Sequence, residues 1–214
     1  MLQPKFAALI AFAISVILVI VKGLAWFFSG SSTVLASFTD SIQDSILSAT
    51  NFLAIRYAMQ PADDHHRYGH GKMEGIAALG QAAFILGSCI YIFLDSIRNF
   101  SNAETVEYPF MTIGVIVFAI VLNGGLVTYQ KLVIKTSKSL AIEADSAHYA
   151  GDIGIHMGVI IAIVAEIYLG WTWADPAIAI VITLWLAKLA LGIGKKAIDM
   201  LMDRELPEEE RDII

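Results

Sequence analysis

Six apolar blocks of about 20 residues each limit the fold of this chain more than any other feature. A helix of about 20 residues crosses the hydrocarbon core of a bilayer and satisfies its own backbone hydrogen bonds there. The blocks cover approximately residues 6–28, 33–58, 75–100, 108–132, 140–169 and 176–198. They predict an all-α membrane protein, with a six-transmembrane-helix bundle over residues 1–200.

Composition supports a membrane protein. The chain is 57% hydrophobic and 16% charged, whereas soluble domains are about 45–50% apolar and about 25% charged. The first block is too long for the core of a signal peptide, and no small-residue cleavage site follows it. The single cysteine, Cys89, lies in an apolar block, which favours a packing role and excludes a disulfide framework. We expect a lipid bilayer around the chain and no nucleic-acid partner.

Basic residues indicate the direction of the spans. Arg98 is nearly alone on one side, while the others flank alternate loops and the C-terminus: Arg56, Arg67, Lys72, Lys131, Lys135, Lys138, Lys195, Lys196 and Arg204. The positive-inside rule then predicts that both termini are cytoplasmic, as in a multi-pass protein of the bacterial inner membrane. Trp26, Trp171 and Trp173 fall at the opposite interface, as expected for an aromatic belt.

Residues 201–214 contain LPEEERDII, in which a proline precedes three glutamates. That pattern is typical of the first turn of a soluble helix. We interpret the segment as the start of a cytoplasmic C-terminal region that is truncated here, with a naturally short tail as the alternative.

Two blocks carry charged residues far from their ends. The second contains Asp40 and Asp44, and the fifth contains His148 and Asp152. Residues four apart share a helix face, so each helix presents a pair of ligand atoms on one side. An aspartate at the bilayer centre costs about 2.5–3.5 kcal/mol on insertion scales and usually marks an ion pathway or a proton relay.

The predicted spans two and five are antiparallel, so Asp44 is level with His148 and Asp40 is level with Asp152. Three carboxylates and one imidazole suit a tetrahedral site for Zn²⁺ or a similar divalent ion. The alternative is a proton relay or a set of packing residues that binds no metal. Asp145, three residues before His148, is interpreted as a residue with a helix-end or hydrogen-bonding role, and an entry ligand is the alternative.

A polar loop follows the second block and reads PADDHHRYGHGK. Asp63, His66 and His70 are spaced three and four apart in a segment that two glycines make bendable. Clusters of His and Asp of this kind suit Zn²⁺. Asp64 and His65 are alternative ligands, and a solvated loop without metal is the alternative to the site as a whole.

The two charged pairs, the six spans and the loop QPADDHHRYGHGKMEGIAAL together resemble the cation diffusion facilitator family, in its branch of bacterial zinc and ferrous-iron efflux pumps. The resemblance extends from KGLAWFFSGS to LMDRELPEEER. It implies a homodimeric, proton-coupled antiporter that exports Zn²⁺, with Fe²⁺ and Cd²⁺ as alternatives, and not an enzyme. Proton and metal compete for the same ligand atoms, because a ligand must be deprotonated to bind metal.

The resemblance also assigns residues. The family's transport site falls on the two charged pairs, and its second, cytoplasmic site falls on Asp63, His66 and His70. An interlock near the family's dimer interface falls on Lys72 and Asp203. The chain departs from the family at Ala147, where relatives carry a bulky apolar residue.

A metal-dependent intramembrane hydrolase is the main alternative function, and a non-transporting structural or channel-like protein is the third. The hydrolase is disfavoured because the chain has no His-Glu-x-x-His motif and no general base beyond the ligands themselves. The donor set does not rank Zn²⁺ against Fe²⁺, Cd²⁺ or Mn²⁺, since all of these accept mixed oxygen and nitrogen ligands.

Overall fold

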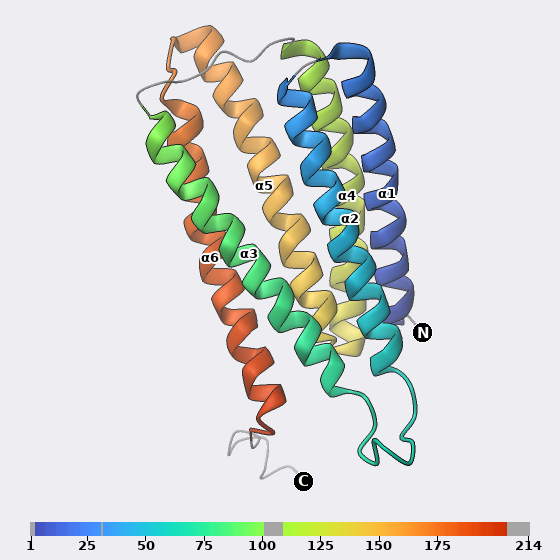
Figure 1. Ribbon diagram of the computed structural model, residues 1–214. Helices are drawn as coiled ribbons and strands as arrows, with labels where there is room; N and C mark the ends of the chain where they lie inside the picture. Colours follow the sequence, from blue (N-terminus) through green and yellow to red (C-terminus); the bar gives the residue numbers. More distant parts are fainter. Residues whose placement is uncertain (1–2, 31, 101–108, 205–214) are drawn as a thin grey trace.

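The computed structural model describes residues 3–30, 32–100 and 109–204. These residues form six α-helices and no strand: α1 (Pro4–Ser29), α2 (Ser32–Ala58), α3 (Lys72–Asn99), α4 (Pro109–Ser137), α5 (Leu140–Leu169) and α6 (Ala174–Leu201). The helices run side by side along one axis, with α5 between the α3–α6 pair and the group of α1, α2 and α4 (Figure 1). The prediction of an all-α, six-helix bundle is confirmed.

Among the described residues, five helices are long and apolar enough to cross a membrane: α1, α3, α5, α6 and the segment Ile113–Ser137 of α4. The remaining helix, α2, has 27 residues and is less apolar because it carries Asp40 and Asp44. It lies parallel to the bundle axis like its neighbours (Figure 1). Its polar side chains are therefore held at membrane depth by the helices around it.

Residues 59–71 connect α2 to α3 at the end of the bundle where α1 begins and α6 ends (Figure 1). We call this the loop end and the other the opposite end. The loop end is the one that the basic residues predict to be cytoplasmic.

Several helix boundaries differ from the predicted ones. α3 begins at Lys72 instead of residue 75, and α4 continues to Ser137 instead of ending at residue 132. The N-cap of α6 is Trp173, and Asp175 lies in the first turn. An aspartate is favourable at the N-cap and also in the first turn, where it interacts with the helix dipole. The residue type therefore does not distinguish the two positions.

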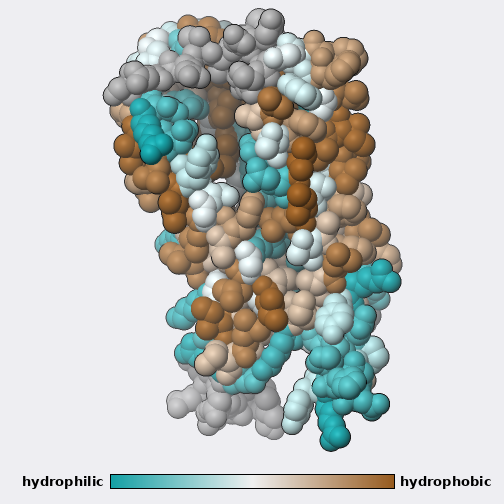
Figure 2. Space-filling view, in the orientation of Figure 1, coloured by the Kyte–Doolittle hydropathy of each residue, from teal (hydrophilic) through white to brown (hydrophobic). Residues whose placement is uncertain are grey.

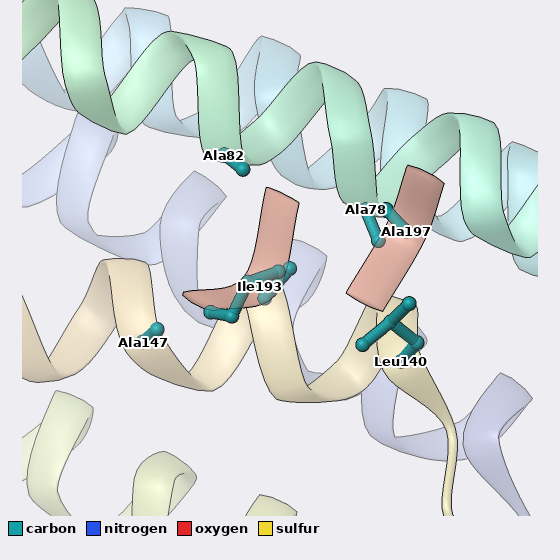
Figure 3. Packing of buried hydrophobic residues seen from close by; sticks show 7 residues of the cluster. Ala78, Ala82, Leu140, Ala147, Ile193 and Ala197 are labelled. Carbon is teal, nitrogen blue, oxygen red and sulfur yellow. The ribbon is translucent and has the colours of Figure 1, made fainter. Parts of the chain in front are cut away.

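Small side chains hold α3, α5 and α6 close together near the loop end. Their buried cluster consists of Ala78, Ala82, Leu140, Ala144, Ala147, Ile193 and Ala197 (Figure 3). Alanines let the helix backbones approach closely and make many van der Waals contacts. In a membrane these contacts drive helix association, because no hydrophobic effect acts between helices in lipid. Ala147 is 6% exposed in this cluster.

The loop-end half of α5 is enclosed on all sides. Its buried residues run almost without interruption from Leu140 to Tyr149, whereas only Gly158, Ala162 and Ile163 are buried beyond Gly151. Gly151 itself faces α6, where a Cβ atom would lie 2.6 Å from Leu186 Cδ2. The polar residues of α5 thus lie where a tightly packed half of the helix meets a more open half.

Candidate metal centre

Asp44 of the predicted second span meets the charged pair of the fifth span inside the bundle. His148 Nε2 on α5 lies 3.1 Å from Asp44 Oδ1 on α2 and 3.7 Å from Asp152 Oδ2, one turn further along α5. One ligand atom from each of the three residues lies within 4.8 Å of the other two. The structure thus brings together three of the four residues predicted for the membrane site.

The spacing of these atoms suits a tetrahedral ion. Bonds of about 2.0–2.1 Å to Zn²⁺ place neighbouring ligand atoms about 3.3 Å apart, and the two distances from His148 lie on either side of that value. Asp152 Oδ2 is buried and has no hydrogen-bond partner within the described residues. A buried carboxylate oxygen without a donor is costly unless a cation or proton occupies the space beside it.

Asp40 lies outside this group of three. It is one turn from Asp44 toward the opposite end, and its side chain is exposed. Near that end, Figure 2 shows a hollow between the α2 side and the α3 side of the molecule, with hydrophilic side chains in and beside it. The side chains of Asp44 and Asp152 are 22% and 21% exposed, and that of His148 is 9% exposed.

Toward the loop end, a buried hydrogen-bond network closes the site. Asp145 is 1% exposed, and its two oxygens accept from Gln81 Nε2 of α3 at 3.0 Å and from Gln130 Nε2 of α4 at 2.6 Å. Beside it, the hydroxyls of Ser48 on α2 and Tyr149 on α5 lie 2.6 Å apart. Asp145 has the hydrogen-bonding role. Its two bonds join α5 to α3 and α4, and the separate hydroxyl pair joins α5 to α2.

The loop between α2 and α3 forms a second cluster. Asp63 Oδ1 lies 3.1 Å from His66 Nδ1, and Asp63 Oδ2 lies 3.4 Å from His70 Nε2. Asp63 also accepts from the backbone N–H groups of His66 at 2.6 Å and His65 at 3.0 Å. These hydrogen bonds, that from His66 first, stabilise the carboxylate and lower the pKa of Asp63, which is thus ionised and able to bind metal at neutral pH.

Burial separates the members of the loop cluster. His70 is 5% exposed, with its ring 4.5 Å from that of Tyr57, and its Nδ1 has no partner among the described residues. Asp63 and His66 are about half exposed. Asp64 and His65, the alternative ligands, are exposed and lie outside the cluster of three ligand atoms.

Lys72 and Asp203 form an ion pair at the loop end. Lys72 Nζ lies 2.8 Å from Asp203 Oδ2 and also donates to the backbone oxygen of Leu201 at 3.3 Å. Both side chains belong to one chain here, and they are 56% and 76% exposed. The pair connects the start of α3 to the residues just after α6.

Sequence reasoning missed two groups of buried polar residues. Lys22 of α1 is 4% exposed, and the amides of Asn51, Gln81 and Gln130 are all buried on α2, α3 and α4. Lys22 interrupts an otherwise apolar block, which was a visible signal. The amides carry no charge and give little signal, because their burial depends on which helices meet.

Comparison with known proteins identifies the family. The cation efflux transmembrane domain model matches residues 8–202. The chain belongs to the cation efflux family. Cation-efflux pump FieF of Shewanella oneidensis is 42% identical over 207 residues, covering 97% of this chain and 70% of the relative. Pumps of the same name from Salmonella paratyphi A and Serratia proteamaculans are 41% and 40% identical, with 96% and 98% of this chain and 68% and 70% of the relatives covered.

This membership confirms the resemblance drawn from the charged pairs and the loop. The cation efflux protein is a metal cation transporter and a multi-pass protein of the bacterial inner membrane. The intramembrane hydrolase is not favoured, because the relatives are pumps by name.

The Asp145 network makes a testable contribution to stability. Replacing Asp145 with Leu leaves the buried amides of Gln81 and Gln130 without an acceptor, at about 1–3 kcal/mol for each unsatisfied group. We expect a lower midpoint of thermal unfolding in detergent for Asp145→Leu than for the unmodified chain. Thr50→Val is the control, since Thr50 is exposed on α2 and bonds only its own helix at 2.9 Å. Equal midpoints for the two variants would contradict a structural role for the network.

Proposed function

We propose that this chain is a proton-coupled antiporter that exports Zn²⁺ from the cytoplasm, with Fe²⁺, Cd²⁺ and Mn²⁺ as alternative substrates. The observation that carries the proposal is the meeting of Asp44 with His148 and Asp152 between two antiparallel helices. Family membership supports metal efflux, and this cluster supplies the ligands that efflux through the membrane requires.

The donor set is compatible with Zn²⁺ as the substrate. Asp44, His148 and Asp152 supply two carboxylates and one imidazole, and Asp40 supplies a fourth ligand when its side chain turns toward Asp44. Zinc accepts four such ligands in tetrahedral geometry. The carboxylates also balance the charge of the ion where the dielectric constant is low.

Coupling to protons follows from competition at His148. Without metal, His148 Nε2 is within hydrogen-bond distance of Asp44 Oδ1. Metal binding requires that this nitrogen carry no proton and that the contact between imidazole and carboxylate open around the ion. Protons entering from outside therefore displace the metal, and the inward proton gradient drives its export.

The gradient of exposure along the site supports access from the opposite end in this conformation. Exposure falls from Asp40 through Asp44 and Asp152 to Asp145, which is 1% exposed. Loading from the cytoplasm requires the network around Asp145 to separate. We infer that the loop cluster of Asp63, His66 and His70 binds a second metal ion beside that entrance.

Flux through proteoliposomes tests the transport site. Asp152→Ala and Asp44→Ala each remove a ligand, and we expect either variant to lose Zn²⁺ flux driven by a pH gradient while eluting normally in size-exclusion chromatography. Ser88→Ala is the control, because Ser88 lies in α3 and outside both metal clusters. Flux at the unmodified rate in both aspartate variants would refute the assignment.

The Lys72–Asp203 pair is proposed to contribute to a homodimer. An exposed pair contributes only about 0–1 kcal/mol, so the proposal requires that the dimer bury these side chains. We expect Lys72→Ala and Asp203→Ala each to weaken dimerisation in analytical ultracentrifugation, and the charge-swapped double variant to recover part of it. Lys196→Ala, which breaks the exposed Lys196–Glu143 pair of 2.5 Å, is the control. Strictly additive effects, without coupling energy, would argue against the interlock.

A further inference from the structure

Lys22 is a buried cation that neither metal cluster includes. It lies on the interior stripe of α1, which consists of Ala7, Ala8, Ala11, Ser15, Leu18, Lys22 and Ala25. Its exposed fraction is 4%. Among the described residues, no carboxylate oxygen lies within ion-pair distance of its Nζ atom.

Snorkelling to the membrane surface does not account for this lysine. The nearer end of α1 is at Ser29, about 10 Å away along the axis, which is further than a lysine side chain extends. The Cα–Cβ bond of a helical residue also tilts toward the helix N-terminus, away from that end. A lysine whose ammonium group reached water would be more than 4% exposed.

Contacts between α1 and α2 place Lys22 at the depth of the transport site. The Trp26 ring stacks on that of Phe38 with centroids 5.9 Å apart. A Cβ atom at Gly23 would lie 2.9 Å from Phe38 Cε2. Because the two helices are antiparallel, the residue just before Gly23 is level with the residues just after Phe38, and Asp40 is among them.

Lys22 therefore lies at the depth of the site's carboxylates. Asp40 and Asp44 lie on α2 and Asp152 lies on α5, whereas Lys22 comes from a third helix, α1. One lysine and three aspartates from three helices thus share one level of the bundle.

We propose that Lys22 is a specificity-determining residue of the transport site, whose positive charge makes the site select divalent cations. The inference rests on the proposed transport site of Asp40, Asp44, His148 and Asp152. Three ionised carboxylates and one ammonium group have a net charge of minus two, which one divalent ion neutralises. A trivalent ion leaves one positive charge and a monovalent ion one negative charge, both unfavourable at low dielectric.

The test compares a divalent with a trivalent ion in variants of the 214-residue chain. Every variant carries His70→Ala, which removes one ligand of the loop cluster. Lys22→Met removes the charge and keeps an apolar stem, whereas Lys22→Arg keeps the charge. Lys188→Met removes a lysine from α6, where the side chain is exposed. Titration calorimetry in detergent gives the Kd values for Zn²⁺ and Tb³⁺ at one pH and ionic strength.

The expected result is a change in the ratio of the two affinities. Coulomb energy scales with ion charge, so loss of one positive charge favours Tb³⁺ over Zn²⁺ by about tenfold or more in Lys22→Met. Competition by protons acts on the same ligands for both metals and cancels in the ratio. Lys22→Arg and Lys188→Met keep the parent ratio. A lysine with only a structural role would weaken both metals alike and leave the ratio unchanged.

One further variant separates this inference from the proposed function. Asp152→Ala in the same background should lose the Zn²⁺ site. If it does and Lys22→Met keeps the parent ratio, the role of Lys22 is refuted and the transport site stands. If Asp152→Ala binds Zn²⁺ with the parent Kd, the site itself is refuted. Lys22→Gln carries the same expectation as Lys22→Met and replaces it if that variant does not elute as one species in size-exclusion chromatography.

Discussion

An ionised side chain in the hydrocarbon region of a bilayer requires a partner, and this requirement organises the centre of the bundle. Asp44 on α2 is 3.1 Å from His148 on α5, and this contact joins the least apolar helix to the most enclosed one. Among the described residues, α2 is the one helix outside the five that are long and apolar enough to cross a membrane by length and composition alone. Its place at membrane depth depends on the polar partners that α5 presents to it.

The two aspartates of α5 have different surroundings, and the difference distinguishes a structural residue from a residue of the proposed transport site. Asp145 is held by two amide donors from two other helices, so both of its oxygens are satisfied without a cation. Asp152 lies two turns further along the same helix and has a buried oxygen without a donor. Neutral donors make a permanent contact, whereas an unsatisfied carboxylate beside an imidazole suits a ligand that enters and leaves.

The apolar blocks predicted the number and order of the helices, because a span of hydrocarbon demands about 20 apolar residues whatever the tertiary contacts. Boundaries were less predictable. α4 continues to Ser137 past its apolar block, since a helix extends into water at little cost. Asp175 fits either the cap or the first turn of α6, so its residue type does not decide between them.

The candidate site was predicted in part. The spacing of Asp44, His148 and Asp152 on two antiparallel helices was enough to predict that these residues meet. The exposed orientation of Asp40 depends on the space between α2 and α3, which residue spacing does not describe. Lys22 and the amides around Asp145 were missed because their role depends on the packing of four helices. A buried lysine has the same sequence signal as one that reaches the membrane surface.

The coordination shell of a metal ion bound between α2 and α5 tests the proposed transport site most directly. Zinc K-edge X-ray absorption of the His70→Ala protein, loaded with one Zn²⁺ per chain, reports the ligand types and distances. We expect a four-coordinate shell with one imidazole nitrogen and the remaining ligands oxygen, at about 2.0–2.1 Å. This signal should be lost in Asp152→Ala. A shell with two or more imidazoles, a sulfur ligand, or six oxygens and no imidazole would contradict it.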